Sequence, residues 1–320
     1  MPASLTTLSK WACEKLHAPS ITLHPISRGL SARHYYRLEH DNQPFILADA
    51  SDDMSEISSF VMIDNWFSAV DIRVPRVYFT EETQGFLLLE DFGAVDLFSE
   101  LNDSNVMSWY RNGGNIIEHM QKKLTVKSDI LPRFDDAFYQ REWSIFVEGY
   151  LKEYCGLDIQ PHQKLLEKIF SMLVSTHREQ PQIFVHRDFH SQNLMVLNNK
   201  ELGVLDFQSA RVGPLSYDAV SLLKDCYIEW PTKIVDKLAI EILTPLWSEK
   251  KSDEVLLRYF DLTGLQRHLK VMGQFARQVN VGKHSRQEDL TRVERYVLHV
   301  LERYSDLHEF NLLLKDIIKK

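Results

Sequence analysis

The pattern of apolar and polar positions divides the chain into two differently built regions. Up to about residue 90, short apolar runs alternate with polar or glycine-containing turns, which predicts a small antiparallel sheet. The expected strands are 21–26, 35–38, 45–48, 76–79 and 86–89, with helices at 5–17 and 57–70. From about residue 96 the apolar spacing becomes that of long helices. These helical segments are 105–124, 136–154, 162–178 and most of 215–318.

The change of pattern predicts an α+β chain of two lobes. A chain of 320 residues with 44% hydrophobic content exceeds the size at which one core usually splits. The first lobe is expected to span 1–92, ending near Asp91-Phe92-Gly93, and the second to span 93–320. Inside the second lobe two short strands, 194–197 and 203–205, are expected as a hairpin.

Charge and cysteine usage narrow the class of protein. With 37 Lys and Arg against 45 Asp and Glu, the formal net charge is -8, which disfavours binding to nucleic acid or anionic membranes. The three cysteines lack CxxC spacing, which argues against a disulfide framework or zinc site. The N-terminus lacks a secretory pattern, and no run approaches the ~18 apolar residues of a membrane span. We expect a soluble cytoplasmic protein with no obligate protein partner.

The segment from His186 to Asn193 carries the clearest chemical signal. It matches HRDxxxxN, a kinase catalytic loop, and Asp206 follows it after the expected hairpin. Phosphoryl transfer needs a carboxylate to orient and deprotonate the attacking hydroxyl, and oxygen ligands to hold Mg²⁺ against the phosphates. Asp188 is the candidate base, and Asn193 and Asp206 are the candidate metal ligands. A chance tripeptide beside a turn-capping aspartate is the alternative, which the spacing and the hairpin disfavour.

The other residues of this loop suggest support of the backbone. His186, Arg187 and His190 are expected to brace the loop and not to contact substrate.

These residues resemble the aminoglycoside phosphotransferase and choline kinase superfamily. Gln208 replaces the glycine of DFG and no APE-like segment follows, so a small-molecule acceptor is expected. More narrowly, four segments resemble the anomeric kinases of bacterial cell-wall recycling, over residues from about 20 to 305. They are GFLLLEDFG, FVHRDFHSQNLMV, GVLDFQSARVGPLSYDAVSLLKDCYIEWP and LTGLQRHLKVMGQFAR. The resemblance implies a protein-kinase-like fold, ATP, Mg²⁺ and phosphorylation of N-acetylmuramate or N-acetylglucosamine at the C1 hydroxyl for peptidoglycan recycling.

The nucleotide site departs from the superfamily pattern at one position. The strand 45–49 has no lysine where the superfamily places a phosphate-contacting one. Arg33 and Arg37 are candidates to replace it, because guanidinium groups suit phosphate oxygens; the alternative is that both are solvated strand residues. The loop 27–31 lies where a phosphate cradle would pass but is not a GxGxxG. The backbone around Glu90 and Phe92 is expected to contact adenine.

The acceptor pocket is expected after Asp206 and on the helix 265–279. Gln208 is a candidate for sugar hydroxyls, and Arg211 for an acidic substituent such as the lactyl carboxylate of muramate, unless Arg211 pairs with Asp218. On the helix, a cationic stripe either lines an anionic-ligand site or is simply solvated, and it consists of Arg267, Lys270, Gln274 and Arg277. The apolar stripe beside it is Leu265, Leu269, Met272 and Ala276. Trp230 is a candidate to stack on a pyranose ring, or a core residue.

Two other functions compete with a sugar kinase. A kinase for choline or an aminoglycoside would need carboxylates and aromatic faces around a cation, which the basic residues Arg211 and Arg267 disfavour. A catalytically silent nucleotide-binding module would fit the missing lysine but not the intact Asp188, Asn193 and Asp206.

Overall fold

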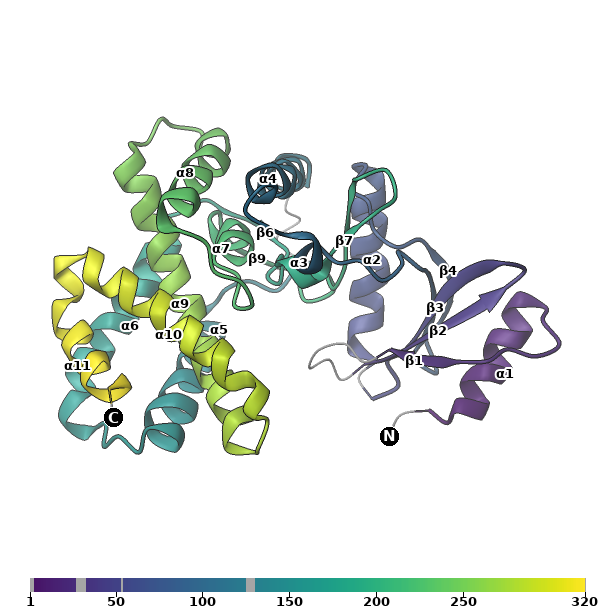
Figure 1. Cartoon of the computed structure of the whole chain (residues 1–320), viewed down its shortest axis with the longest axis horizontal. Coiled ribbons are helices and arrows are strands. Elements are labelled where there is room, and N and C mark those ends of the chain that lie inside the picture. The colour runs from purple at the N-terminus through teal and green to yellow at the C-terminus, as the bar shows by residue number, and fades with distance from the viewer. Residues whose placement is uncertain (1–2, 27–32, 53, 125–129, 320) are drawn as a thin grey trace. The chain divides into compact units, whose positions relative to one another are not determined.

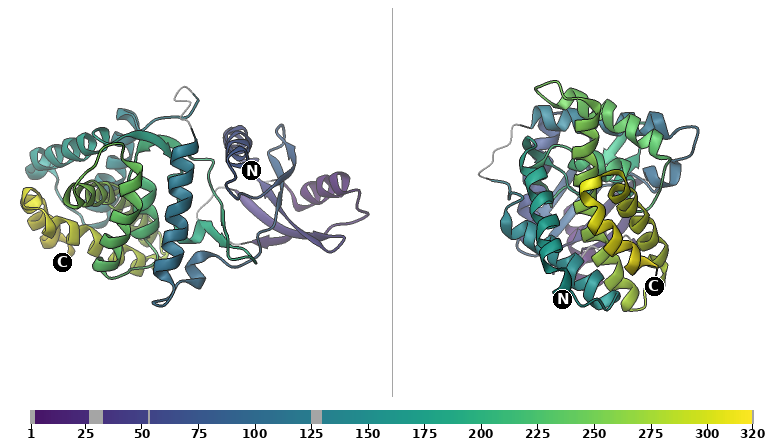
Figure 2. Two further views of the ribbon diagram at one scale, coloured as in Figure 1. Left: turned by 90° about the horizontal axis from the view of Figure 1, so that it is seen from above. Right: turned by 90° about the vertical axis from the view of Figure 1, so that its left-hand side faces the viewer.

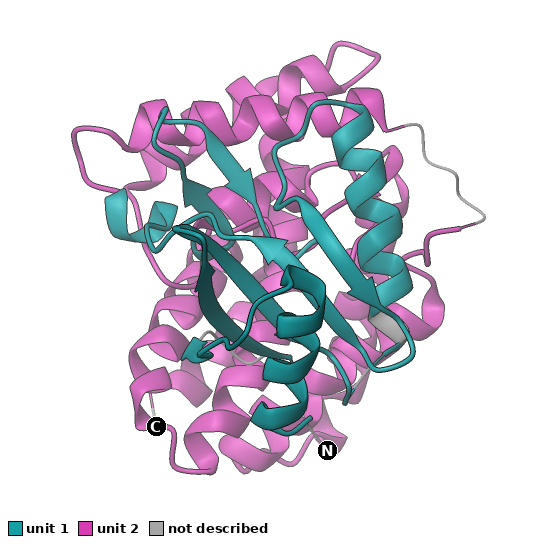
Figure 3. Ribbon diagram, turned by 90° about the vertical axis from the view of Figure 1, so that its right-hand side faces the viewer, with its two compact units in different colours: residues 1–100, 192–209 teal, residues 101–191, 210–320 magenta. Residues whose placement is uncertain are grey.

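The computed structural model describes residues 3–26, 33–52, 54–124 and 130–319. The chain forms two compact units, coloured separately in Figure 3. Unit 1 comprises 1–100 with 192–209, and unit 2 comprises 101–191 with 210–320. The loop 27–31, which we considered as a phosphate cradle, lies outside the described residues.

Unit 1 is built on a five-stranded antiparallel sheet in the order β1-β2-β3-β5-β4 (Figure 1). Its strands are β1 (His24–Ile26), β2 (His34–His40), β3 (Gln43–Asp49), β4 (Val77–Glu81) and β5 (Phe86–Glu90). All five predicted strands are therefore confirmed, with shifted ends. Central β3 pairs with β5 so that Phe45 faces Glu90 and Ile46 faces Leu89.

Two helices accompany this sheet, α1 (Leu5–Leu16) and α2 (Ser55–Ala69), as the apolar spacing predicted. The side chain of Ser4 caps α1 by accepting a hydrogen bond from the backbone N–H of Thr7 at 3.1 Å. The apolar face of α1 packs on the sheet, with the rings of Trp11 and Phe86 edge to face at 5.6 Å. This packing buries one side of the strands.

A hairpin far along the chain completes unit 1. Strands β7 (Leu194–Val196) and β8 (Leu202–Val204) confirm the predicted pair. The N–H of Val196 donates to the carbonyl of Val95, and the N–H of Val204 to the carbonyl of Arg73, at 2.9 and 2.8 Å. These backbone bonds explain why the compact units differ from the single division expected between residues 92 and 93.

Unit 2 is mainly helical, as expected, and Figure 2 shows its last two helices, in yellow, side by side. Its α-helices are α4 (Val106–Lys123), α5 (Asp136–Ser144), α6 (Gln163–Arg178), α7 (Tyr217–Leu223), α8 (Thr232–Leu243), α9 (Asp253–Asn280), α10 (Gln287–Arg303) and α11 (His308–Ile318). The short α3 (Leu97–Glu100) belongs to unit 1. Helix α5 continues directly into a π-helix, Ile145–Tyr154, which the sequence pattern predicted only as more α-helix.

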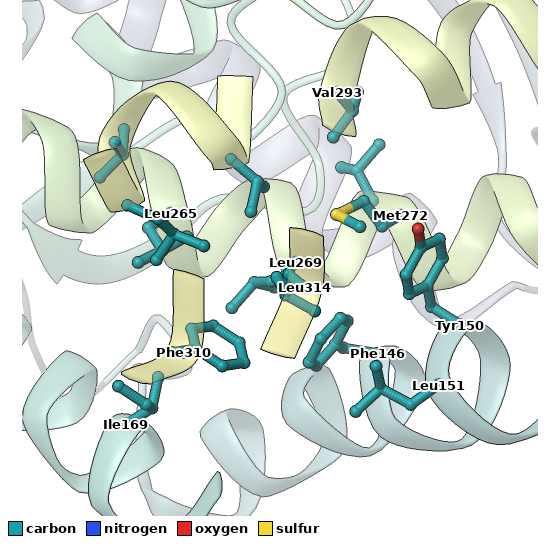
Figure 4. Close-up of a cluster of buried hydrophobic side chains, with 14 of the residues drawn as sticks. Phe146, Tyr150, Leu151, Ile169, Leu265, Leu269, Met272, Val293, Phe310 and Leu314 are labelled. Atoms are coloured by element: carbon teal, nitrogen blue, oxygen red, sulfur yellow. The ribbon is translucent and has the colours of Figure 1, made fainter. Parts of the chain in front are cut away.

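The core of unit 2 lies where α9, α10, α11, α6 and the π-helix meet (Figure 4). The whole predicted apolar stripe of α9 is buried there. Phe146 and Tyr150 of the π-helix pack against this stripe. Helix α9 is therefore anchored through its centre.

A two-stranded ribbon in unit 2 was not predicted. Strands β6 (Gln182–Val185) and β9 (Arg211–Pro214) run antiparallel, with Val185 opposite Arg211. The apolar residues 183–185 lead directly into the segment from His186 to Asn193. The ribbon fixes where that loop begins.

None of the described helices is both long and apolar enough to cross a membrane.

Candidate active site

The catalytic loop leaves β6 through a backbone clamp made by Asp218 of α7. Its carboxylate is fully buried and accepts hydrogen bonds from the N–H groups of His186 and Arg187 at 2.8 and 2.9 Å. Arg187 has a φ of 80°, a conformation that non-glycine residues adopt rarely and that clusters at functional sites. Nδ1 of buried His186 accepts from the N–H of Asp188 at 3.3 Å, which is a bracing contact. The clamp thus fixes the backbone that presents Asp188.

The carboxylate of Asp188 sits among positive charges. Burial by itself would raise its pKa, but nearby cationic side chains outweigh that effect and hold the pKa at about 2. The largest of these effects come from Lys270 and Arg187, and Arg267 contributes as well. Asp188 is therefore ionised at neutral pH.

Two of these cations come from α9, and they are not solvated. Arg267 and Lys270 are only 3% and 6% exposed, so the surface alternative for this part of the cationic stripe is wrong. Further along the same stripe Gln274 and Arg277 are exposed, and Arg277 pairs with Glu153 at 3.2 Å. The stripe therefore divides into a buried half beside Asp188 and a surface half.

Glu142 on α5 pairs with Lys270 and Arg187, although the sequence pattern did not predict it as a site residue. Its carboxylate, 1% exposed, lies 3.8 Å from the Lys270 ammonium and 3.4 Å from the Arg187 guanidinium, and it accepts from Gln266 at 3.0 Å. The sequence does carry one indication that Glu142 is buried. It lies three and four residues after buried Tyr139 and Phe138, and therefore on the apolar face of α5. A charge at such a position requires partners.

The partner of Arg267 is unusual because it is neutral. One guanidinium nitrogen donates to the sulfur of Cys226 at 3.2 Å. Burial raises the pKa of the Cys226 thiol despite the opposing effect of Arg267, so the sulfur stays protonated. Because this partner is neutral, it does not offset the positive charge of Arg267, which can act on Asp188 and on a bound anion.

Arg211 and Trp230, also in unit 2, have different surroundings. Arg211 donates to the carbonyl of Arg133 at 3.3 Å, while Asp218 is used by the backbone clamp, so the predicted Arg211–Asp218 alternative is not formed. Trp230 is 9% exposed and its indole N–H donates to the hydroxyl of Tyr110 at 2.9 Å. These contacts give Trp230 the packing of a core residue.

The two candidate metal ligands lie at the ends of the β7–β8 hairpin in unit 1. The carbonyl of Asn193 accepts from the N–H of Leu205 at 2.9 Å, which brings the chain at Asn193 next to Asp206. Asp206 has a φ of 63°. Phe207 fixes this turn, because its ring stacks on Phe60 at 4.6 Å.

An amide and a carboxylate fit Mg²⁺, which prefers oxygen ligands and keeps several waters beside one or two protein carboxylates. Gln208 lies against the same carboxylate and donates to Oδ1 of Asp206 at 2.7 Å. Its own carbonyl oxygen is buried and, within the described part of the chain, has no hydrogen-bond partner. Gln208 therefore has an acceptor left for a ligand hydroxyl.

The two candidate arginines of the nucleotide site contact other residues of unit 1. Arg33 is 7% exposed and lies over the ring of Phe60 at 5.8 Å, so it is not a solvated strand residue. Arg37 on β2 pairs with Asp91 at 2.5 Å and donates to the carbonyl of Gly93 at 2.9 Å. The hydrogen bond to Asp91 raises the pKa of Arg37.

Arg73, which no sequence pattern indicated, contacts the segment expected to contact adenine. It donates to the Glu90 carboxylate at 2.8 Å, and its guanidinium lies over the ring of Phe92 at 4.6 Å. Phe92 also fills the space where a side chain at Gly203 would stand. Arg73 is 17 residues from Glu90 in sequence, so no local spacing signals this pairing.

Comparison with known proteins finds kinases that are similar to this chain in sequence or in fold. An N-acetylmuramate/N-acetylglucosamine kinase of Pseudomonas aeruginosa is 32% identical, with 93% of this chain and 89% of that protein covered. A GDP complex of aminoglycoside 2'-phosphotransferase-IIIa has a TM-score of 0.65 at 14% identity, covering 92% of this chain and 97% of that one.

Choline kinase LicA from Streptococcus pneumoniae has a TM-score of 0.63 at 10% identity, covering 90% of this chain and 98% of that one. These solved structures confirm the kinase-like two-lobed fold. A family model described as the phosphotransferase enzyme family matches residues 22–249. With the HRDxxxxN loop, the hairpin and Asp206 in place, this chain belongs to the phosphotransferase enzyme family.

Proposed function

We propose that the protein transfers the γ-phosphoryl group of ATP to the anomeric C1 hydroxyl of N-acetylmuramate or N-acetylglucosamine. The product would be the sugar 1-phosphate, and the reaction would serve peptidoglycan recycling in the cytoplasm. The observation that carries the proposal is an ionised Asp188 held among buried cations, in a chain similar to N-acetylmuramate/N-acetylglucosamine kinases. Membership of the phosphotransferase family supports the reaction type.

In this mechanism Asp188 orients the C1 hydroxyl and accepts its proton as the oxygen attacks the γ-phosphate. A carboxylate with a pKa of about 2 is a weak base. It suffices because phosphoryl transfer passes through a loose transition state in which positioning matters more than early deprotonation. The anomeric hydroxyl is also more acidic than other sugar hydroxyls, which reduces the work left to the base.

Asn193 and Asp206 are the residues we propose to hold magnesium. When bound, the ion neutralises charge that develops on the phosphate oxygens. Gln208, whose amide group already holds Asp206, would position a sugar hydroxyl with its remaining acceptor.

For the nucleotide we propose that Arg33 contacts phosphate and that the backbone at Glu90 and Phe92 contacts adenine. Arg37 would act there through its bonds to Asp91 and Gly93, which fix the same segment. Arg267 and Lys270 would serve the acceptor side by holding Asp188 ionised and by attracting an anionic substrate group.

An assay over four acceptors tests the proposal against its rivals. Wild-type protein is expected to phosphorylate N-acetylmuramate or N-acetylglucosamine, with the phosphate on C1 by NMR, and neither choline nor kanamycin. Turnover of choline or kanamycin alone would establish an amine kinase instead. If none of the four acceptors is phosphorylated while nucleotide binding is intact, the protein would be a catalytically silent nucleotide-binding module.

The base is tested by Asp188→Asn. We expect loss of sugar 1-phosphate formation by at least about a hundredfold, the usual contribution of general base catalysis, with nucleotide affinity retained. The exposed Asp103→Asn serves as the control and should behave as wild type. Near-normal turnover of Asp188→Asn would remove Asp188 from the mechanism.

A further inference from the structure

Three arginines of unit 2 surround one phenyl ring next to the catalytic loop. The guanidinium carbons of Arg141, Arg187 and Arg211 lie 5.4, 5.4 and 4.8 Å from the centroid of Phe138. They come from α5, from the residue before Asp188 and from β9. Phe138 is 2% exposed and packs against Phe134 at 4.1 Å, so its ring is a fixed platform.

Among the residues that the structure describes, Arg187 forms an ion pair, whereas Arg141 and Arg211 form none. Arg187 has Glu142 at 3.4 Å, a carboxylate that it shares with Lys270, and the charge of Asp188 also acts on it. Arg211 has the carbonyl of Arg133 at 3.3 Å. The Nε atoms of Arg187 and Arg211 are buried and have no hydrogen-bond partner among the residues that the structure describes.

Like charges gathered in this way repel one another, and buried donors without acceptors cost free energy. Burial lowers the pKa of Arg211, and the neighbouring charges of Arg187 and Arg141 lower it further. An anion received by these guanidinium groups would reduce both costs. Arginine forks are well suited to a carboxylate because they donate two parallel hydrogen bonds.

We propose that Arg141, Arg187 and Arg211 form an anion subsite that receives the carboxylate of an acidic amino sugar, such as the lactyl group of N-acetylmuramate. This inference rests on the proposed function. Arg187 directly precedes Asp188 and its charge lowers the pKa of that carboxylate, so the subsite lies near the proposed base. The subsite would make acidic amino sugars better substrates than neutral ones, and it assigns a function to Arg141, which is exposed and forms no described ion pair.

Specificity constants of two variants, Arg141→Gln and Arg211→Gln, test the subsite. We expect the ratio of kcat/KM for N-acetylmuramate over N-acetylglucosamine to fall roughly tenfold or more in each, the usual effect of losing a charge-assisted hydrogen bond. Wild-type enzyme should show a similar fall when the lactyl carboxylate is replaced by its neutral amide. The matched control is Arg178→Gln, because Arg178 is also exposed and lies over a ring, that of Tyr139 at 6.0 Å. Its ratio should stay at the wild-type value.

Two results would overturn the subsite. A ratio unchanged in both variants would show that the arginines only pack on Phe138. A rise in the KM for ATP, equal with both sugars, would assign the arginines to nucleotide phosphate.

Calorimetric binding of N-acetylmuramate separates the subsite from the proposed function. If wild type binds the sugar but does not phosphorylate it, the proposed function fails, and weaker binding by Arg141→Gln still supports the subsite. If wild type and Arg141→Gln bind it equally, or wild type does not bind it, the subsite fails whatever the turnover.

Discussion

At the scale of single residues, the environment of Asp188 makes the pH dependence of the reaction testable. Lys270 contributes most to lowering the pKa of Asp188. Removing that charge with Lys270→Met should raise the pKa, so the carboxylate would become protonated at a higher pH. The acidic limb of kcat/KM for N-acetylglucosamine should move upward by roughly one unit, a typical effect of one close opposite charge.

A matched control lies on the same helix. Arg277→Gln removes a cation from the exposed end of the stripe, where its partner is Glu153. Its pH profile should overlay that of wild type. An unmoved limb in Lys270→Met would show that another group governs activity at low pH.

His177 on α6 makes a second prediction, about stability. The ring is fully buried, neither nitrogen has a hydrogen-bond partner in the described part of the chain, and burial lowers its pKa to about 3. Between about pH 3 and the ordinary histidine value of ~6.5 the unfolded chain binds a proton that the folded chain does not. The folded state should therefore lose about 2 kcal/mol from this residue at pH 5, relative to pH 8.

His177→Leu should remove that part of the acid destabilisation. The measurement is the free energy of unfolding from urea titrations at both pH values. Exposed His299→Leu on α10 is the control and should keep the wild-type pH dependence. An equal pH dependence in wild type and His177→Leu would contradict the assignment.

The candidate site residues divide into those that a sequence pattern indicates and those that it does not. Asp188, Asn193 and Asp206 are fixed by a short motif and a hairpin, so their spacing alone singles them out. Glu142 was not found because its partners Arg187 and Gln266 are 45 and 124 residues away in sequence. The hydrophobic pattern and spacing of one sequence do not indicate which residues so far apart will pair.

At the scale of elements, the predictions succeeded where periodicity is sustained. Helix α9 was recognised in part, but its burial was not predicted. A stripe of cations normally indicates a solvated face, yet α9 is enclosed by α7, α8, α10 and the π-helix. Strand β9, Arg211–Pro214, was missed because four residues that include a glycine and a proline carry almost no strand signal.

The approach of α9 to the π-helix gives a prediction at this scale. A Cβ atom at Gly273 would overlap the backbone carbonyl of Ile145, which cannot move away as a flexible side chain would. Gly273→Ala should therefore destabilise the fold by about 3 kcal/mol. Because Ile145 follows Glu142 by three residues, kcat/KM should fall as well.

Gly264→Ala is the matched control on the same helix. Its Cβ would meet a Val220 methyl at 3.5 Å, an ordinary contact, and alanine is favoured over glycine in a helix by about 1 kcal/mol. The free energy of unfolding should be unchanged or slightly higher. Equal effects of the two substitutions in urea unfolding would contradict the close packing at Gly273.

At the scale of the whole molecule, the chain does not divide at one point. The segment 192–209, which carries Asn193 and Asp206, belongs to unit 1, whereas Asp188 belongs to unit 2. The hydrophobic pattern predicted one boundary because the short hairpin does not interrupt the helical pattern on either side of it. The hairpin belongs to unit 1 because of its backbone hydrogen bonds to Val95 and Arg73, which lie about 100 and 130 residues earlier in the chain.

The proposed magnesium ligands in unit 1, Asn193 and Asp206, lead to a prediction about ligand-dependent stability. A ligand that binds only the folded state stabilises it, by about 2.7 kcal/mol at a concentration of a hundred times Kd. ADP should therefore raise the Tm of wild type, and Mg²⁺ added with ADP should raise it further through Asn193 and Asp206. In Asp206→Asn the rise with ADP in EDTA should persist, whereas most of the additional rise with Mg²⁺ should be lost. Asp103→Asn should keep both rises, and an undiminished Mg²⁺ effect in Asp206→Asn would exclude that carboxylate as a metal ligand.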